Sequence, residues 1–241
     1  MTEINNGISV SASGIKKAHS VYLKEGKDGK VHVYEVDKKT KAKYQSSGKD
    51  KIKGRKNKDE FLSKKAQAGE LKDLGTIDKS AKAKISVTGT DKDDFIVVDS
   101  KLKQDFEVKG GKGNDWIFGG AGADKLHGDE GKDNVWGGDG NDIIDGGAGD
   151  DTPSSKVRAG LLGGKGDDII KGGTGKDWIA GGKGADTMYG NDGKTDDKEK
   201  DQFSAGKDKD VDEIHKGKGD QVVQKSDNDE IREEGKKKDS H

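Results

Sequence analysis

The most constraining feature of this chain is a period of nine residues that runs through its middle. Eight nonapeptides carry Gly at their first and fourth positions and Asp at their sixth. A weaker copy starts at Gly89, and a decaying copy starts at Gly190. Such a short, fixed period indicates a solenoid, in which each repeat packs only against its neighbours. The full copies start at Gly110, Gly119, Gly128, Gly137, Gly146, Gly163, Gly172 and Gly181.

Composition makes an ordinary apolar core hard to build. Only 27% of the 241 residues are hydrophobic and 39% are charged, a balance that favours disorder. The formal net charge is nevertheless only -1, and many of the 39 glycines stand in register within the repeats. We therefore predict that something besides apolar burial holds the repeats together. The near balance of 46 Lys and Arg against 47 Asp and Glu also argues against a nucleic-acid partner.

Each nonapeptide divides into a turn and a short strand. The glycines of the GGxGxD half permit positive φ and a close approach of neighbouring backbone. In the three-residue strand, the central side chain points inward and its neighbours point outward. We expect the inward positions to form a thin core made of Ile117, Leu126, Val135, Ile144, Ile170, Ile179 and Met188.

Two nonapeptides make one coil, so repeats that are two apart in sequence stack about 4.8 Å apart. This stacking places Asp115, Asp133 and Asp151 in one column and Asp124 and Asp142 in another. Stacked carboxylates repel one another unless a cation lies between them. Ca²⁺ suits such a site because it takes about six to eight oxygen ligands, backbone carbonyls included. Mg²⁺ retains its waters, Zn²⁺ prefers His or Cys, and the chain has no cysteine. We therefore predict several bound Ca²⁺ ions.

These repeats resemble the RTX (repeats-in-toxin, hemolysin-type) calcium-binding nonapeptide GGxGxDxUx, where U is a large apolar residue, over about residues 89–197. The resemblance implies an all-β fold, a right-handed parallel β-roll, with each ion between a turn and the turn one coil on. It implies that the ligands are the sixth-position Asp of both turns and four backbone carbonyls. These carbonyls belong to the second and fourth residues of one turn and the first and third of the other. Carried onto this chain, the implied metal-site residues are Gly111, Gly113, Asp115, Gly120, Gly122, Asp124, Gly128, Glu130, Asp133, Gly137, Asp139, Asp142, Asp151, Gly164, Gly166, Asp168, Gly173, Gly175, Asp177, Gly181, Lys183 and Asp186.

Three features depart from the repeat pattern. Asp129 stands at the position of a second glycine, and Pro153 occupies an inward strand position that suits proline poorly. The spacing from Gly146 to Gly163 is 17 residues, one short of two repeats. We predict one continuous solenoid, in which residues 155–162 complete a turn without metal. How the turns pair across this gap stays open.

Composition divides the chain into three parts. Residues 1–85 are rich in Lys, and we interpret them as a cap on the open end of the solenoid or, alternatively, as a delivery segment. Residues 86–223 comprise the β-roll and its closing strands, and the polar residues 224–241 are expected to be disordered. The closing strands carry three candidate further ligands, Asp210, Asp212 and Asp220.

The N-terminal part contains two recognisable patterns. The segment from Val21 to Val36 alternates apolar and polar residues and predicts a β-hairpin with Asp28 and Gly29 at its turn. The segment from Asp59 to Leu74 predicts a short helix, although Gly69 weakens that pattern.

Three aromatic side chains, Trp116, Phe118 and Trp136, fall at outward positions of strands that stack on one face. We expect them to form an aromatic ladder. This ladder either packs under the N-terminal hairpin or contacts a cell-surface, glycan or protein partner.

No segment has the apolar run of a signal-peptide core or of a membrane span. Together with the RTX resemblance, this predicts a secreted bacterial protein, associated with virulence, that leaves by a type I route without a cleaved N-terminal signal; type III is the alternative. The chain contains neither HExxH nor GxSxG, so we predict no enzymatic activity. The expected function is an adhesive or effector-type module that folds on Ca²⁺ outside the cell. The alternative is an accessory or targeting module of a secreted enzyme, with an unrecognised activity in residues 1–85.

Overall fold

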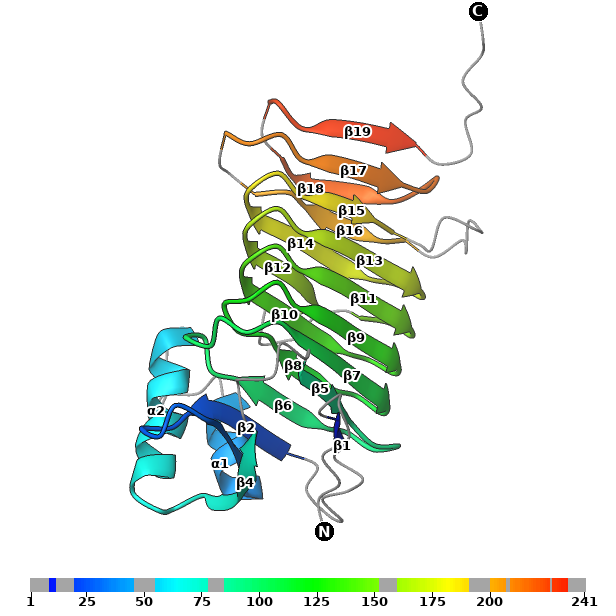
Figure 1. The fold of residues 1–241 in the computed structure, drawn as a ribbon. Coiled ribbons are helices and arrows are strands. Elements are labelled where there is room, and N and C mark those ends of the chain that lie inside the picture. The colour runs from blue at the N-terminus through cyan, green and yellow to red at the C-terminus, as the bar shows by residue number, and fades with distance from the viewer. Residues whose placement is uncertain are drawn as a thin grey trace, which may run out of the picture.

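The computed structural model describes residues 9–11, 20–45, 55–77, 85–151, 160–190, 200–206, 209–225 and 227–233. Within them the chain forms two sheets that stack coil upon coil into an elongated body, with helices beside its N-terminal end (Figure 1). Through the repeats, successive strands alternate between the two sheets and pair in parallel. This architecture is a parallel β-roll, which confirms the fold class predicted from the period.

One sheet has nine strands, all paired in parallel. In spatial order they are β1 (Ser9–Ser11), β5 (Ile85–Thr88), β7 (Phe106–Lys112), β9 (Lys125–Glu130), β11 (Ile143–Ala148), β13 (Ile169–Thr174), β15 (Thr187–Tyr189), β17 (Glu213–Lys216) and β19 (Glu230–Glu233).

The other sheet has ten strands, and only its N-terminal edge is antiparallel. From the C-terminal edge the order is β18 (Gln221–Gln224), β16 (Gln202–Ser204), β14 (Trp178–Lys183), β12 (Leu161–Lys165), β10 (Asn134–Asp139), β8 (Trp116–Phe118), β6 (Phe95–Val98), β2 (Ser20–Glu25), β3 (Val31–Glu35) and β4 (Lys72–Ile77).

The core between the two sheets is a ladder of single apolar side chains. Ile144 lies between Leu126 and Ile170 in the nine-stranded sheet, and Val135 lies between Ile117 and Leu161 in the ten-stranded sheet. All of the inward residues predicted from the repeat are completely buried, which confirms the predicted thin core. Each strand of the repeats therefore contributes about one buried aliphatic group, a thin core for a body of this length.

The roll continues across the irregular gap, as predicted. β12 pairs with β10 on one side and β14 on the other, and Leu161 takes the inward position between Val135 and Ile179. Pro153 and residues 155–159 lie outside the described residues. The next described strand of the roll, β12, begins at Leu161.

The predicted hairpin is present, and it extends the roll. β2 and β3 pair antiparallel, and Gly29 takes a φ of 76° at the connecting turn. β2 also pairs in parallel with β6, so that β2, β3 and β4 continue the ten-stranded sheet beyond the first coil. The N-terminal edge of that sheet is therefore covered by strands that carry no repeat.

The helical prediction for residues 59–74 is only partly correct. The helix α2 runs from Arg55 to Gln67, and Gly69 follows it with a φ of 71°. A left-handed glycine directly after a helix is a common stop signal, and it releases the chain into β4. The helix α1 (Lys38–Gln45) was not predicted, because its mainly Lys-rich sequence has a weak apolar pattern. None of the described helices is long and apolar enough to cross a bilayer.

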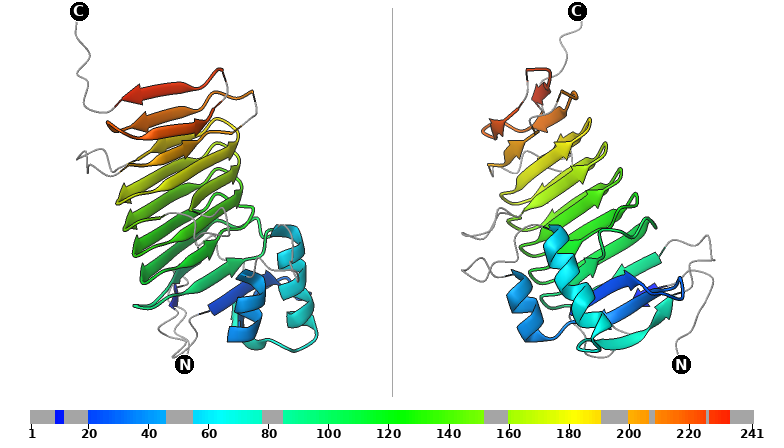
Figure 2. Two further views of the ribbon diagram at one scale, coloured as in Figure 1. Left: turned by 180° about the vertical axis from the view of Figure 1, so that it is seen from behind. Right: turned by 90° about the vertical axis from the view of Figure 1, so that its left-hand side faces the viewer.

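The two helices lie against the outer face of the roll near its N-terminal end (Figure 2). Tyr44 of α1 meets the rings of Phe95 and Phe118 at centroid distances of 5.1 and 5.4 Å. Phe118 stacks on Trp136 at 4.3 Å, so the predicted aromatic ladder exists. It is covered by helices and not by the hairpin, which corrects the packing alternative considered from the sequence.

The C-terminal end departs from expectation at one element. Residues 230–233 belong to the tail that composition predicts to be disordered, yet they form β19 and pair in parallel with β17. Ile231 pairs in register with the buried Ile214 but is itself 40% exposed at this end of the roll. The division into three parts otherwise stays a prediction.

Candidate metal sites

The sixth-position aspartates form two ladders of hydrogen bonds along the roll. In the first column, the backbone N–H of Asp115 donates to Oδ1 of Asp133, and that of Asp133 donates to Oδ1 of Asp151, both at 2.8 Å. In the second column, the N–H of Asp124 donates to Oδ1 of Asp142 at 2.8 Å. The predicted stacking of these carboxylates is therefore confirmed.

Both columns cross the irregular gap without losing register. The N–H of Asp142 donates to Oδ1 of Asp168 at 2.8 Å, and the N–H of Asp151 donates to Oδ1 of Asp177 at 2.9 Å. The residues in each of these pairs are 26 apart in sequence, against 18 elsewhere in the array. The pairing of turns that the sequence left open is thus settled, and the extra residues leave the columns uninterrupted.

The columns extend beyond the regular repeats at both ends. The N–H of Asp94, in the weak first copy, donates to Oδ1 of Asp115 at 2.7 Å. At the other end the N–H of Asp177 donates to Asp201 at 2.9 Å, and the N–H of Asp186 donates to Asp212 at 2.8 Å.

The last members of the columns are Asp220 and Asp229, whose Oδ1 atoms accept from Asp201 and Asp212 at 3.1 and 3.4 Å. Of the three candidate ligands near this end, Asp212 and Asp220 belong to the columns. Asp210 is exposed and does not align with them. Asp201 and Asp229 were missed because irregular spacing hides them from a nine-residue pattern.

The two oxygens of a column carboxylate differ in their surroundings. The Oδ2 atoms of several column aspartates are buried and have no hydrogen-bond partner among the described residues. Each of these side chains is at most 1% exposed. A buried carboxylate oxygen without a partner is costly, so each such atom marks a place where a cation would be stabilising. The residues are Asp115, Asp133, Asp142, Asp151 and Asp168.

The space around each of these oxygens is kept by a first-position glycine. A Cβ at Gly110 would overlap Oδ2 of Asp115 and would lie 2.6 Å from the carbonyl oxygen of Gly128, one coil on. A Cβ at Gly137 would likewise meet Asp142 and would lie 2.7 Å from the carbonyl of Gly163. A carboxylate oxygen and a carbonyl oxygen thus border the same small space, which any side chain at the first position would fill. This donor set fits a hard, oxygen-seeking cation such as Ca²⁺.

The second and fourth glycines shape the turn itself. Gly111 and Gly113 have φ of 105° and 112°, a region that other residues rarely adopt. The N–H of Gly113 donates to the carbonyl of Glu130, one coil on, at 2.9 Å. The Glu130 side chain pairs with Lys112 at 3.1 Å, and that of Asp139 with Lys165 at 2.7 Å, both at exposed positions. Third-position residues therefore face the columns with their backbone, and their side chains lie at the surface.

Burial dominates the electrostatics of the columns. It raises the pKa of Asp115, Asp142 and Asp151 to about 8, that of Asp168 to about 7 and that of Asp133 to about 6. The N–H bond that each Oδ1 accepts works in the opposite direction, but it does not offset burial. The carboxyls of Asp115, Asp142 and Asp151 therefore favour a proton, or a cation in its place, near neutral pH.

Side chains alone would not complete a metal site here. Among the residues that the structure describes, no three His, Cys, Asp or Glu side chains gather as metal ligands do. Each turn brings one sixth-position aspartate to its column, so most donors would be carbonyls. Ca²⁺ accepts such a set readily, whereas Zn²⁺ does not. The residue-by-residue ligand set stays a prediction.

A second ladder, which sequence reasoning missed, runs beside the carboxylate columns at the fifth position of the repeats. The N–H of Lys132 donates to Oδ1 of Asn114 at 2.9 Å, and the N–H of Lys176 donates to Oδ1 of Asp150 at 3.0 Å. These bonds run in the direction opposite to those of the sixth position, so the turns are tied from both sides. The recurrence of Asn or Asp at this position was the available signal.

The fold and the two carboxylate columns define a metal-binding parallel β-roll. The family model described as RTX calcium-binding nonapeptide repeat (4 copies) matches residues 107–135, 123–153 and 162–194. The middle of the chain therefore consists of RTX calcium-binding repeats, as the nonapeptide pattern predicts. No curated protein and no solved structure matches the chain.

Proposed function

We propose that this chain is a secreted RTX β-roll that folds on Ca²⁺ outside the cell and serves as a non-enzymatic adhesive or effector-type interaction module. One observation supports this most strongly. The centre of the roll buries unpartnered carboxylate oxygens in two columns, each beside a glycine carbonyl of the next coil. A chain with so thin an apolar core gains little by folding around these groups unless a cation joins them.

Calcium binding and folding form one equilibrium in this proposal. The two turns that share an ion are 18 or 26 residues apart, so the unfolded chain has no preformed site. Low cytosolic calcium would keep the repeats unfolded during export, and the higher concentration outside would fold them. The proposed secretion by a type I route rests on this coupling and on the family of the repeats.

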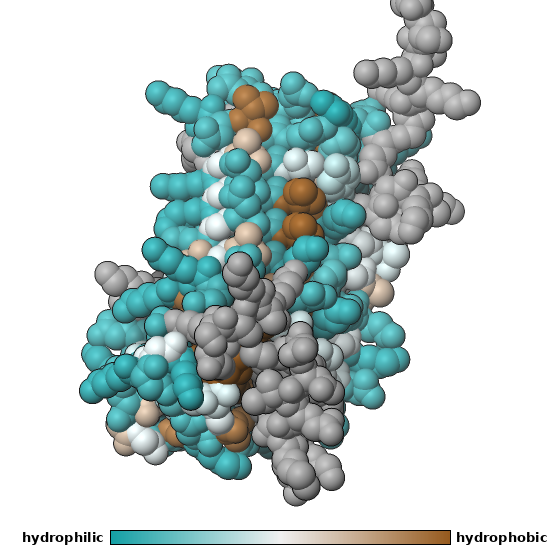
Figure 3. All heavy atoms as spheres, in the orientation of Figure 1, coloured by the Kyte–Doolittle hydropathy of each residue, from teal (hydrophilic) through white to brown (hydrophobic). Residues whose placement is uncertain are grey.

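The partner surface proposed from the sequence needs revision. Phe118 is only 2% exposed beneath α1, so it cannot contact a partner directly. Trp116 and Trp136 are half-buried beside it and keep some exposed surface. A second exposed apolar group is the pair Ile143 and Ile169, neighbours in β11 and β13 that are 37% and 41% exposed. Figure 3 shows small hydrophobic spots on an otherwise hydrophilic face.

Calcium-dependent attachment is the direct test of this function. Fluorescently labelled protein is incubated with bacterial cells in millimolar Ca²⁺, in Mg²⁺ and in chelator, and bound fluorescence is counted. We expect attachment in Ca²⁺ only, and loss of attachment in the double variant Asp133→Asn/Asp151→Asn. A protein that is folded in Ca²⁺ but does not attach would contradict the adhesive role. A protein whose folding and attachment are the same in Ca²⁺ and in chelator would contradict the whole proposal.

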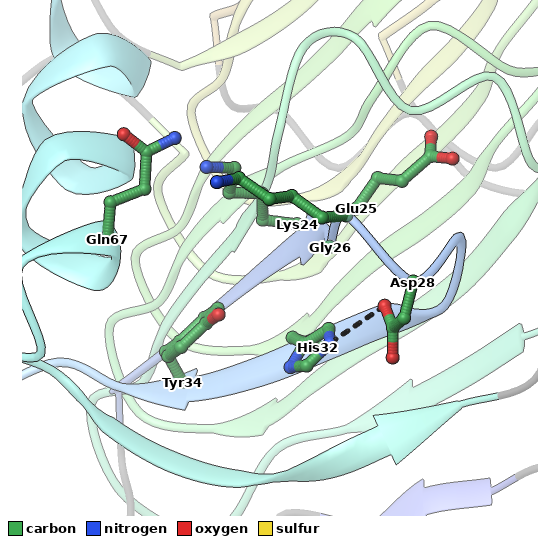
Figure 4. Close-up of a pocket in the computed structure, with 8 residues that line it drawn as sticks. Lys24, Glu25, Gly26, Asp28, His32, Tyr34 and Gln67 are labelled. Atoms are coloured by element: carbon green, nitrogen blue, oxygen red, sulfur yellow. Dashed lines mark hydrogen bonds and ion pairs between the residues drawn. The ribbon is translucent and has the colours of Figure 1, made fainter.

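The pocket beside the hairpin is where an N-terminal activity would be sought (Figure 4). It has a volume of about 730 Å³ and includes Lys24, His32 and Tyr34 in its lining. Nδ1 of His32 lies 2.8 Å from Asp73, and Nε2 lies 3.1 Å from Asp28. These carboxylates raise the pKa of His32 and engage both ring nitrogens. His32 therefore ties β3 to β4 and to the hairpin turn, which favours a structural role over the accessory-enzyme alternative.

A further inference from the structure

The first turn of each carboxylate column differs in backbone conformation from the turns that follow. In most repeats the second and fourth glycines adopt positive φ, as at Gly138 (124°) and Gly140 (111°). Gly120 and Gly122, in the turn of residues 119–124, do not. The turn of residues 89–94 has Thr and Lys at the same two positions, and neither has positive φ.

This difference changes what the sixth-position aspartate contacts. The N–H of Thr90 donates to Oδ2 of Asp94 at 2.5 Å, and its hydroxyl donates to the same oxygen at 3.0 Å. The N–H of Gly120 donates to Oδ2 of Asp124 at 2.7 Å. The same contact, from the second residue to the sixth, thus occurs in both turns. It satisfies the oxygen that has no partner in Asp115, Asp133, Asp142, Asp151 and Asp168.

Neighbouring structure explains why the second residue of these two turns donates to the sixth-position carboxylate. The loop that follows β6 lies against the turn of residues 119–124, where the N–H of Ala121 donates to the carbonyl of Leu102 at 2.7 Å. A Cβ at Gly120 would lie 2.7 Å from that same carbonyl oxygen. The turn therefore rests on an irregular loop instead of on a repeat. In the other column, β-branched Thr90 disfavours the left-handed conformation that the second position takes elsewhere.

We propose that each of these two turns ends its carboxylate column with hydrogen bonds to the aspartate in place of a bound ion. Cation binding then begins at Asp115 in the first column and at Asp142 in the second. The inference rests on the proposed calcium-dependent function and limits which turns take part in it. N–H and O–H donors stabilise a buried carboxylate oxygen as a cation does, and they are present before any calcium binds. The first turns would then form a calcium-independent platform on which the first ion-binding turn stacks.

Isosteric substitutions in the full chain test this assignment. Asp94→Asn and Asp124→Asn alter the closing turns, and Asp133→Asn and Asp168→Asn are their matched controls in the same two columns. Bound Ca²⁺ per chain is counted by equilibrium dialysis, with circular dichroism in Ca²⁺ to verify folding. We expect the first two variants to bind as many ions as the unaltered chain and each control to bind at least one fewer. Loss of an ion from Asp94→Asn or Asp124→Asn would overturn the inference.

A measurement on the unaltered chain covers the case in which a variant fails to fold. Anomalous difference density from crystals grown with Ca²⁺ or soaked with Tb³⁺ locates each ion directly. We expect peaks beside Asp115, Asp133, Asp142, Asp151 and Asp168, and none between the turns of Asp94 and Asp115 or of Asp124 and Asp142. A peak at either of these two positions would contradict the inference and leave the proposed function intact, whereas a chain that binds no Ca²⁺ would contradict both.

Discussion

The N-terminal unit and the repeats are held together in different ways. Tyr44 of α1 and Leu62 of α2 pack with Tyr22 and Phe95 of the ten-stranded sheet, and these four fully buried side chains belong to a second core on its outer face. A repeat such as that of Ile144 buries one aliphatic side chain and one carboxylate per turn. The two regions share a continuous sheet, yet only the N-terminal one has the apolar packing of an ordinary domain.

Calcium should therefore affect the stability of the repeats and of the N-terminal unit unequally, although both belong to one continuous sheet. The junction is tight, because β2 pairs with β6 and the Tyr22 hydroxyl donates to the buried carboxylate of Asp99. Removal of calcium should therefore unfold the repeats and leave the N-terminal unit as a folded remnant.

Truncation of a core residue should have the largest effect, and the effect should depend on the region. Leu62→Ala removes a fully buried side chain and should destabilise the N-terminal unit by about 2–5 kcal/mol, with little change in the Ca²⁺ midpoint of the repeats. Leu126→Ala, equally buried in the roll, should raise the Ca²⁺ midpoint, because folding and binding are coupled there. Thermal melts and Ca²⁺ titrations followed by circular dichroism measure both. Equal effects on the Ca²⁺ midpoint would remove the distinction.

The raised carboxyl pKa values predict that pH acts on the roll without calcium and acts little on its calcium affinity near neutral pH. In chelator, a folded roll binds more protons than the unfolded chain between about pH 4 and 8, because burial raises the pKa of Asp115, Asp142 and Asp151 to about 8. Its residual structure should therefore decrease as pH rises through that window. Calcium binds as the chain folds, and the carboxyls of the unfolded chain are already ionised above about pH 5, so few protons are displaced and the calcium affinity should change little between pH 6 and 8.

The two pH dependences are measured by circular dichroism in chelator and by calorimetric Ca²⁺ titration at several pH values. The N-terminal unit supplies the internal control, since its core contains few of these carboxyls. A calcium affinity that rises about tenfold per pH unit between pH 6 and 8 would show that calcium displaces protons from a roll that is already folded, and would contradict the coupling of binding to folding.

Asp129 is the one described residue other than glycine that has positive φ, at 76°. Asp129→Gly should stabilise the calcium-bound roll by about 1 kcal/mol, because glycine takes this conformation without strain. Gly147, its neighbour in β11, has a φ of 100°, and a Cβ there would lie 2.8 Å from the carbonyl carbon of Asp129. Gly147→Ala should therefore destabilise, and thermal melts in Ca²⁺ should give opposite signs for the two variants.

The surface ion pair of Lys165 and Asp139 should contribute least. The pair spans two coils at 2.7 Å, but both side chains are more than half exposed. Lys165→Ala should change the free energy of unfolding in Ca²⁺ by less than about 1 kcal/mol and leave the Ca²⁺ midpoint unchanged. A large shift in that midpoint would mean that third-position side chains, and not only their carbonyls, take part in the sites.

Much of the roll could be predicted because a short period fixes position. The register of Gly, Asp and one aliphatic residue located the columns and the inward residues such as Leu126 and Ile170, since each repeat has the same environment. The hairpin was predictable for a similar reason, because alternation about Asp28 and Gly29 is a local signal.

The remainder depended on tertiary contacts that no local pattern records. α1 owes its place to Tyr44, which packs on Phe95 and Phe118 from a distant part of the chain. Asp201 and Asp229 joined the columns after irregular spacings, so a fixed period missed them. The turn of residues 119–124 matches the repeat in every letter, yet the loop at Leu102 holds it in a different conformation.

The most direct test of the account is hydrogen exchange of the full chain, resolved by segment, in chelator and in millimolar Ca²⁺. We predict that amides of the repeats, from about β9 to β15, exchange rapidly in chelator and become protected in Ca²⁺. Amides of β2, β3 and α2 should be protected in both conditions. Equal protection of the repeats with and without Ca²⁺ would show that cations do not hold the coils together.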